Sequence, residues 1–112
     1  MSDSRLPAQL EVAALIRAAE SAGGFATVLA KGERDAGTVL ILTLERGGPA
    51  RLWERLPRVD GKRVFTVVRI QHPDEKQDFE DFLRRRTARD RDAWLIELDI
   101  VNAERLIAEF AA

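Results

Sequence analysis

Apolar residues recur along the first part of the chain with the spacing of one helical face. Residues 7–22 therefore predict a helix, and Pro7 suits its first position. The apolar positions of this face are Val12, Leu15, Ile16 and Ala19. Gly23 and Gly24 follow, and glycine readily adopts the left-handed conformation that ends helices. The pattern therefore predicts a helix that stops at this glycine pair.

Strand-like patterns come next, and the segment 38–45 is the strongest of them. Its apolar residues alternate between two faces: Leu40, Leu42 and Leu44 on one, Val39 and Ile41 on the other. A strand that is apolar on both faces is typical of a sheet covered on both sides, so we expect 38–45 at the centre of the sheet. Further strands are expected at 25–30, 50–56, 63–70 and 94–100. Pro57 lacks a backbone N–H, which favours an edge or short strand at 50–56.

Local signals predict the remaining connections and helices. Asp60-Gly61 is typical of a hairpin turn between the two middle strands. A helix is expected over 74–86, where Gln77 stands at capping-box spacing from the first residue. Asn102 is a candidate cap for a last helix.

The predicted elements follow the order αββββαβα. Four consecutive strands joined by short turns favour a largely antiparallel sheet with helices packed on it. We therefore expect a single α+β domain over residues 1–112, with about five mainly antiparallel strands. Helices are expected at both chain ends and before the last strand. The length of 112 residues is typical of one domain.

Composition narrows the classes of function. The chain has no cysteine, which excludes disulfides and thiolate metal sites and is compatible with the cytoplasm. Its longest apolar run, Val39 to Leu42, is far shorter than the roughly 20 residues that span a bilayer. The amino terminus lacks the basic and then apolar layout of a secretory signal. The formal net charge of −1 gives no overall attraction to nucleic acid or anionic lipid. We expect a soluble cytoplasmic protein that binds no membrane.

Few residues offer catalytic chemistry. The single histidine, His72, has no serine or threonine near it in sequence, and no phosphate-binding glycine loop is present. The acidic residues Asp90, Asp92 and Glu97 could share a divalent cation and support a small metal-dependent hydrolase. Neighbouring arginines would satisfy the same acids by ion pairing. We therefore expect no metal, no cofactor and no catalytic residue, and keep the hydrolase as the alternative.

The hairpin holds a basic and aromatic pattern. A turn of odd length would segregate its side chains, because a shift of one residue moves a strand's side chains to the other face. One face would then carry Arg51, Trp53, Arg55, Arg63, Phe65 and Arg69. Such a face could stack the bases of single-stranded nucleic acid, which we treat as a second alternative. The competing interpretation is that a helix or a second subunit covers Trp53 and Phe65.

Three stretches, 14–26, 31–37 and 90–97, resemble the small bacterial proteins catalogued as domain of unknown function 1491. The most specific stretch is the acidic turn that leads through Trp94 to Glu97. The resemblance implies a stand-alone domain without an assigned activity, so it transfers no catalytic residue. By analogy, it also implies a shared surface. The residues of that candidate surface are Lys31, Asp35, Asp90, Asp92, Trp94 and Glu97.

These observations favour a non-enzymatic binding or protein-interaction domain of the bacterial cytosol. Its candidate interaction surface is the hairpin set Arg51, Trp53, Arg55, Phe65 and Arg69. The partner is expected to be another protein or a second copy of the chain, in preference to nucleic acid. A homodimer would pair the 50–56 edge or stack the two aromatic faces. In a monomer, Trp53 would instead pack beneath a helix of its own chain.

Overall fold

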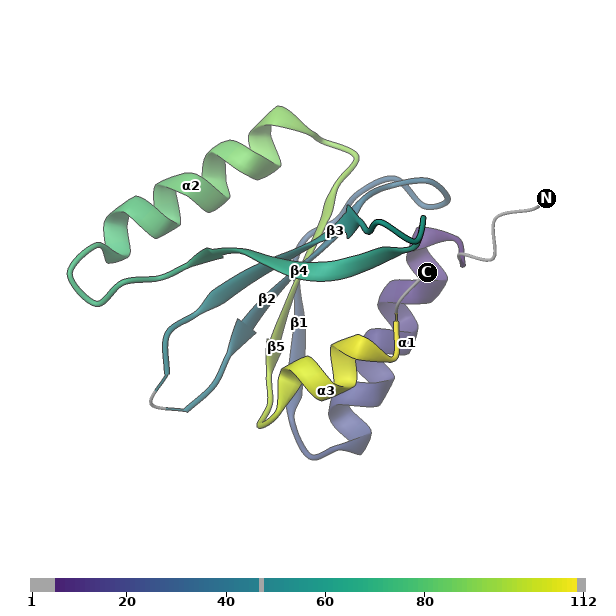
Figure 1. Ribbon diagram of the computed structural model, residues 1–112, viewed down its shortest axis with the longest axis horizontal. Coiled ribbons are helices and arrows are strands. Elements are labelled where there is room, and N and C mark those ends of the chain that lie inside the picture. The colour runs from purple at the N-terminus through teal and green to yellow at the C-terminus, as the bar shows by residue number, and fades with distance from the viewer. Residues whose placement is uncertain (1–5, 47, 111–112) are drawn as a thin grey trace.

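A five-stranded sheet separates two helical layers in the computed structural model, which describes residues 6–46 and 48–110 (Figure 1). In chain order the elements are α1 (Ala8–Ser21), β1 (Phe25–Ala30), β2 (Val39–Leu44), β3 (Arg51–Pro57), β4 (Arg63–Ile70), α2 (Lys76–Arg89), β5 (Trp94–Asp99) and α3 (Ala103–Ala108). This confirms the α+β class and the predicted order of elements. No helix among these residues is long and apolar enough to cross a membrane.

The strands lie in the order β1-β5-β2-β3-β4. Strands β2 and β5 run parallel, and the other three neighbouring pairs are antiparallel. The position of β2 at the centre confirms the prediction from its two apolar faces. Strand β5 enters the sheet after the crossover through α2 and separates β1 from β2, so β1 forms one edge of the sheet and β4 the other.

Each face of the sheet has its own hydrophobic core. Helices α1 and α3 cover the face that carries Val39 and Ile41, while α2 covers the face that carries Leu40 and Leu42 (Figure 1). The α2 layer is narrow, because Phe79 is the only fully buried apolar residue of that helix. The two apolar faces of β2 therefore pack against two different helical layers.

The glycine stop of α1 has the predicted form. Gly23 has a φ of +87°, its N–H donates to the Glu20 carbonyl at 3.1 Å, and the Gly24 N–H donates to the Ala19 carbonyl at 2.9 Å. This is a Schellman motif, which satisfies carbonyls that the helix end leaves free.

The other two helices begin differently from the sequence prediction. Helix α2 starts at Lys76 and runs to Arg89, and no side chain caps its first turn, so the capping box predicted at 74–77 is wrong. Asn102 does precede α3, but it adopts a left-handed conformation with a φ of 60° and its side chain caps nothing. Its carbonyl accepts the Arg105 N–H at 3.1 Å.

The hairpin has an odd connection, as the segregation of its side chains predicted. Pro57 faces Arg63, which leaves the five residues 58–62 as the loop. The expectation of an edge or short strand at 50–56 is wrong, because β3 lies between β2 and β4. Strand β2 pairs with β3 only at Arg51–Trp53. Pro57 therefore has a ladder partner on the β4 side alone, and its missing N–H interrupts no pairing with β2.

Candidate functional site

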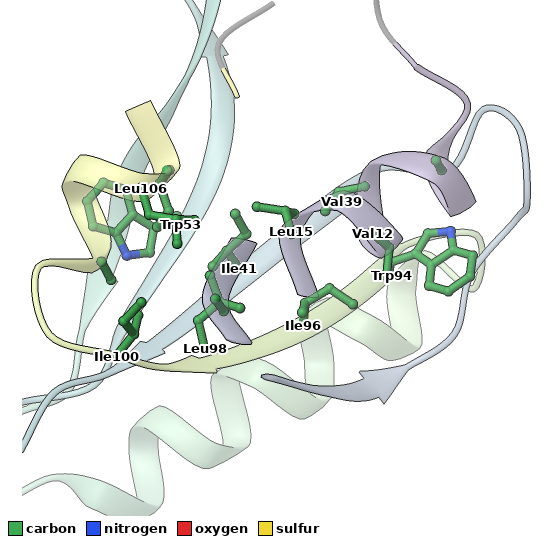
Figure 2. Packing of buried hydrophobic residues seen from close by; sticks show 14 residues of the cluster. Val12, Leu15, Val39, Ile41, Trp53, Trp94, Ile96, Leu98, Ile100 and Leu106 are labelled. Atoms are coloured by element: carbon green, nitrogen blue, oxygen red, sulfur yellow. The ribbon is translucent and has the colours of Figure 1, made fainter. Parts of the chain in front are cut away.

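Trp53 is buried beneath the last helix and is 8% exposed. Figure 2 shows its indole beside Leu106 of α3, at the opposite end of the core from Trp94. The indole Nε1–H donates to the Thr43 Oγ1 at 2.9 Å, which satisfies the one polar group of the ring. Stacking a nucleic-acid base on this ring would require α3 to leave the sheet.

Arg55 is also inside the protein. Its guanidinium forms a two-pronged ion pair with Glu11 of α1, in which the Nη1–Oε1 distance is 2.8 Å, and both side chains are 5% exposed. The same guanidinium donates to the Phe110 carbonyl at 2.7 Å and lies 4.3 Å from the Phe65 ring centroid. The group therefore links α1, the hairpin and the chain beyond α3.

The five hairpin residues chosen from the sequence do not form one surface. Arg51, Trp53, Arg55 and Phe65 share the face under α1 and α3, as expected. Arg69 lies on the opposite face, 4.6 Å from the Phe82 ring centroid. The cause is a β-bulge in the β3–β4 pair, where Val68 of β4 is the extra residue between the partners of Leu52 and Trp53, so that Arg69 lies opposite Leu52. The shared face predicted for Arg69 is therefore wrong.

The turn at residues 90–94, which is part of the family resemblance, packs against loop 31–37 through hydrogen bonds to backbone carbonyls. The Glu33 N–H donates to the Asp92 carbonyl at 3.0 Å, and the Trp94 indole donates to the Glu33 carbonyl at 2.8 Å. An added Cβ would lie 2.2 Å from the Asp92 oxygen at Gly32 and 2.3 Å from it at Gly37. Any other residue at position 32 or 37 would therefore force the backbone of the turn at Asp92 to move.

The same loop also completes the start of α1. The carbonyls of Arg34 and Asp35 accept the N–H groups of Gln9 at 2.8 Å and Ala8 at 3.0 Å, which are donors that the first helical turn cannot pair internally. The Glu33 carboxylate accepts the Ala36 and Asp35 N–H groups within the loop. These hydrogen bonds, the one from Ala36 above all, hold the pKa of Glu33 below its usual range. Loop 31–37 therefore joins the start of α1 to the turn that precedes β5.

Of the candidate shared-family surface, Glu97 stands apart. The structure brings loop 31–37 and the turn at Asp90–Trp94 together, whereas Glu97 lies halfway along β5 between Thr27 and Leu42. Asp90 accepts the Asp92 N–H at 3.1 Å and lies 3.9 Å from the Arg86 guanidinium. In the part of the chain that the structure describes, no group of three or more histidines and carboxylates could hold a metal ion.

The exposed apolar feature that sequence reasoning missed is β1. Phe25 is 74% exposed, Val28 41% and Leu29 48%. The strand contains no charged residue and no proline. Strand β4 at the other edge carries Arg63 and Arg69 near its two ends. Charges protect edge strands against pairing with other chains, and β1 lacks them.

A shallow depression continues this apolar edge. It has a volume of about 540 Å³ and lies beside Phe25, between Leu44, Asp99 and Val101. A second groove of about 430 Å³ lies between α3 and the hairpin, over Trp53 and Phe65. The first is the larger and borders side chains that no part of the described chain covers. We therefore take the β1 edge as the candidate functional site.

Comparison with known proteins gives one family and several related structures. The family model described as "Protein of unknown function (DUF1491)" matches residues 6–108. The crystal structure of a DUF1491 family protein from Caulobacter crescentus CB15 is 38% identical, with 84% of this chain and 87% of that chain covered and a TM-score of 0.74. The solution structure of protein Atu0922 from A. tumefaciens is 28% identical, with 93% of each chain covered and a TM-score of 0.75. The comparison with curated proteins gave no match.

Proposed function

The chain belongs to the DUF1491 family of proteins of unknown function, and from this premise we propose that it is a non-enzymatic protein-interaction domain whose binding element is the β1 edge. In this function an extended segment of a partner adds to the sheet beside β1, so that main-chain hydrogen bonds supply affinity and side-chain contacts supply specificity.

The exposure of β1 is the observation that carries this proposal. Natural sheets protect their edges with charges, prolines, covering elements or β-bulges, and of these β1 has only the bulge near its end. Phe25, Val28 and Leu29 are instead apolar and open to solvent on an edge strand. Burying these side chains against a partner strand removes apolar surface from water, which is the main favourable term in protein association.

The surroundings of the polar residues support a non-enzymatic role. The hydrolase alternative requires Asp90, Asp92 and Glu97 to converge, and they belong to no candidate metal cluster in residues 6–46 and 48–110. The nucleic-acid alternative requires an open Trp53 and free arginines, whereas Trp53 is covered and Arg55 is paired with Glu11. The acidic residues therefore offer no shared metal site for hydrolysis, and the Trp53 and Arg55 side chains are not open to a nucleic acid.

We assign the domain to the bacterial cytosol. The bacterial sources of the related structures support the first part of this assignment. A fold that uses no disulfide is compatible with a reducing compartment, which bears on the second part. Fractionation of cells that express the tagged chain at its native level checks the compartment.

Photo-crosslinking in the source cell tests the proposed function. A benzophenone amino acid replaces Phe25 in one variant and Val59 in the control, since Val59 is fully exposed at the hairpin tip, away from β1. We expect protein adducts of defined mass from position 25 in clear excess over position 59. A second change, Thr27→Lys, should reduce the adducts, because a lysine on the edge opposes strand addition. Equal labelling from the two positions contradicts the proposal.

A further inference from the structure

Charges of opposite sign lie beside the two ends of β1, although the strand itself is uncharged. Phe25 stands directly opposite Asp99 and Thr27 directly opposite Glu97 in the antiparallel pair with β5. Directly opposed residues share a face, so both carboxylates flank the first half of the strand. Lys31 follows the last strand residue and is exposed. Asp99 of β5 therefore lies beside the start of β1, Glu97 of β5 lies beside its middle, and Lys31 follows its end.

An edge of this kind is complementary to itself. Two copies of one strand pair antiparallel about a twofold axis perpendicular to the sheet. The axis then passes midway between a residue and the same residue of the other copy. An axis at Thr27 sets Ala26 opposite Val28, and Phe25 opposite Leu29, of the other copy. Lys31 of one copy then lies at the end of the strand where the other copy carries Asp99.

We propose that the segment which pairs with β1 is β1 of a second copy, with the twofold axis at Thr27. This inference rests on the proposed function and names its partner. The two five-stranded sheets join into one continuous sheet, and the dimer has α1 and α3 of both copies on the same side.

The side chains of the strand fit this arrangement. Phe25 is 74% exposed and Leu29 is 48% exposed. In the dimer, Phe25 of each copy packs against Leu29 of the other copy, so this contact forms twice. The Phe25–Leu29 pairs bury apolar surface, and threonine pairs are among the favourable cross-strand combinations. No charged residues face each other directly between the two paired strands, because the six residues of β1 are uncharged.

The β-bulge near the end of β1 is compatible with the pairing. The register with β5 is continuous from Phe25 to Val28 and shifts between Val28 and Ala30, which leaves Leu29 as the extra residue. In a bulge the two residues that oppose one partner residue point to similar sides. Leu29 therefore points to the side of Ala30, which packs in the α2 core with Leu95. Phe25 and Thr27 share this side with Asp99 and Glu97, as the pairing with Leu29 requires.

Sedimentation equilibrium measures the self-association of the full chain. We expect the wild-type mass to rise from one chain to two between micromolar and millimolar concentrations. Thr27→Lys should weaken dimerisation at least about tenfold, which corresponds to about 1.4 kcal/mol, because two lysines would face each other across the axis. The same lysine lies opposite Glu97 within one chain, so the fold is retained. The matched control is Val59→Lys, which should dimerise as the wild type does.

Single-cysteine variants test the register, since the chain has no cysteine of its own. Directly opposed residues have Cβ atoms about 4.5–5.5 Å apart, close to disulfide geometry. Thr27→Cys should therefore form a disulfide dimer at least about tenfold faster than the control Val59→Cys. A mixture of Phe25→Cys and Leu29→Cys should give the mixed dimer in preference to either homodimer.

The outcomes separate this inference from the proposed function. A wild-type mass of one chain at every concentration, or equal disulfide rates at positions 27 and 59, overturns the self-pairing. If position 25 then still yields adducts with a different protein in cells, the edge remains a binding element with another partner. If it yields none, both the self-pairing and the proposed function fail.

Discussion

Glu11 and Arg55 are 44 residues apart in the sequence and form a buried ion pair, with each side chain 5% exposed. The pair fixes α1 to the β3–β4 hairpin. The Arg55 Nε is buried and has no hydrogen-bond partner within the described residues, so the charges are incompletely compensated. Burying two charges is costly, and their attraction offsets this cost only when the geometry is complete.

Removing one member of this pair should destabilise the protein strongly. We expect Glu11→Gln to lower the free energy of unfolding by about 3–5 kcal/mol, because the Arg55 charge stays buried without its counterion. The double variant Glu11→Leu with Arg55→Met should recover most of the loss. Urea denaturation measures both, with the exposed Glu20→Gln on the same helix as control. A loss below about 1 kcal/mol, as for a surface pair, contradicts this prediction.

Trp53 should act as a core residue. Trp53→Ala removes an indole that is packed under α3 and bonded to Thr43. We expect a loss of about 3–5 kcal/mol in the free energy of unfolding, measured by urea denaturation against the exposed control Val59→Ala. Titration with single-stranded RNA should leave the wild-type tryptophan emission unchanged. A near-neutral Trp53→Ala would mean that the Trp53 indole is accessible. Quenching by RNA in the wild type that is absent in Trp53→Ala, which keeps Trp94, would mean the same.

The backbone approach at loop 31–37 should make Gly37 intolerant of a side chain. A Cβ there lies 2.3 Å from the Asp92 oxygen and 2.7 Å from the Glu33 oxygen, so Gly37→Ala must displace backbone. We expect it to cost about 1–3 kcal/mol. The matched control is Gly48→Ala, where the nearest atom lies at 3.5 Å, and it should stay within about 0.5 kcal/mol. Equal stabilities of the two variants would show that the turn at Asp92 yields freely.

Glu33 should make loop 31–37 sensitive to acid. Hydrogen bonds from the Ala36 and Asp35 N–H groups lower the pKa of Glu33 in the folded chain. A depressed folded pKa means that the stabilisation is present above the unfolded pKa and is lost as the pH falls through the folded pKa. Wild type should therefore exceed Glu33→Gln in stability at neutral pH, and the difference should shrink on acidification.

Titration of the side-chain carboxyl carbons by NMR checks this directly. Glu33 should titrate below its usual range, while protection of the Asp35 and Ala36 amides falls over the same pH interval. A Glu33 carboxyl that titrates in the ordinary range of glutamate would contradict the prediction.

Patterns within a few residues were enough to predict much of the fold. The two apolar faces of 38–45 required helical layers on both sides, and β2 lies at the centre of the sheet for that reason. The glycine pair ended α1 because the left-handed conformation at Gly23 needs no partner far away in the chain. The hairpin loop was odd because only such a loop segregates the hydrophobic side chains of its strands. The sequence alone therefore determined the element order, the α+β class and most element bounds, since the physics behind them is local.

Tertiary structure decided the candidate site. The apolar sequence of 25–30 is typical of a buried strand, yet β1 is exposed because β5 takes the place beside β2. The bulge at Val68 moved Arg69 to the other face, although the side chains between the hairpin loop and the bulge alternate as predicted. Arg55, with a charge that suggested a binding surface, was buried because α1 brings Glu11 to it. Strand order, bulges and ion pairs between distant residues depend on which segments pack together, and no local pattern encodes that choice.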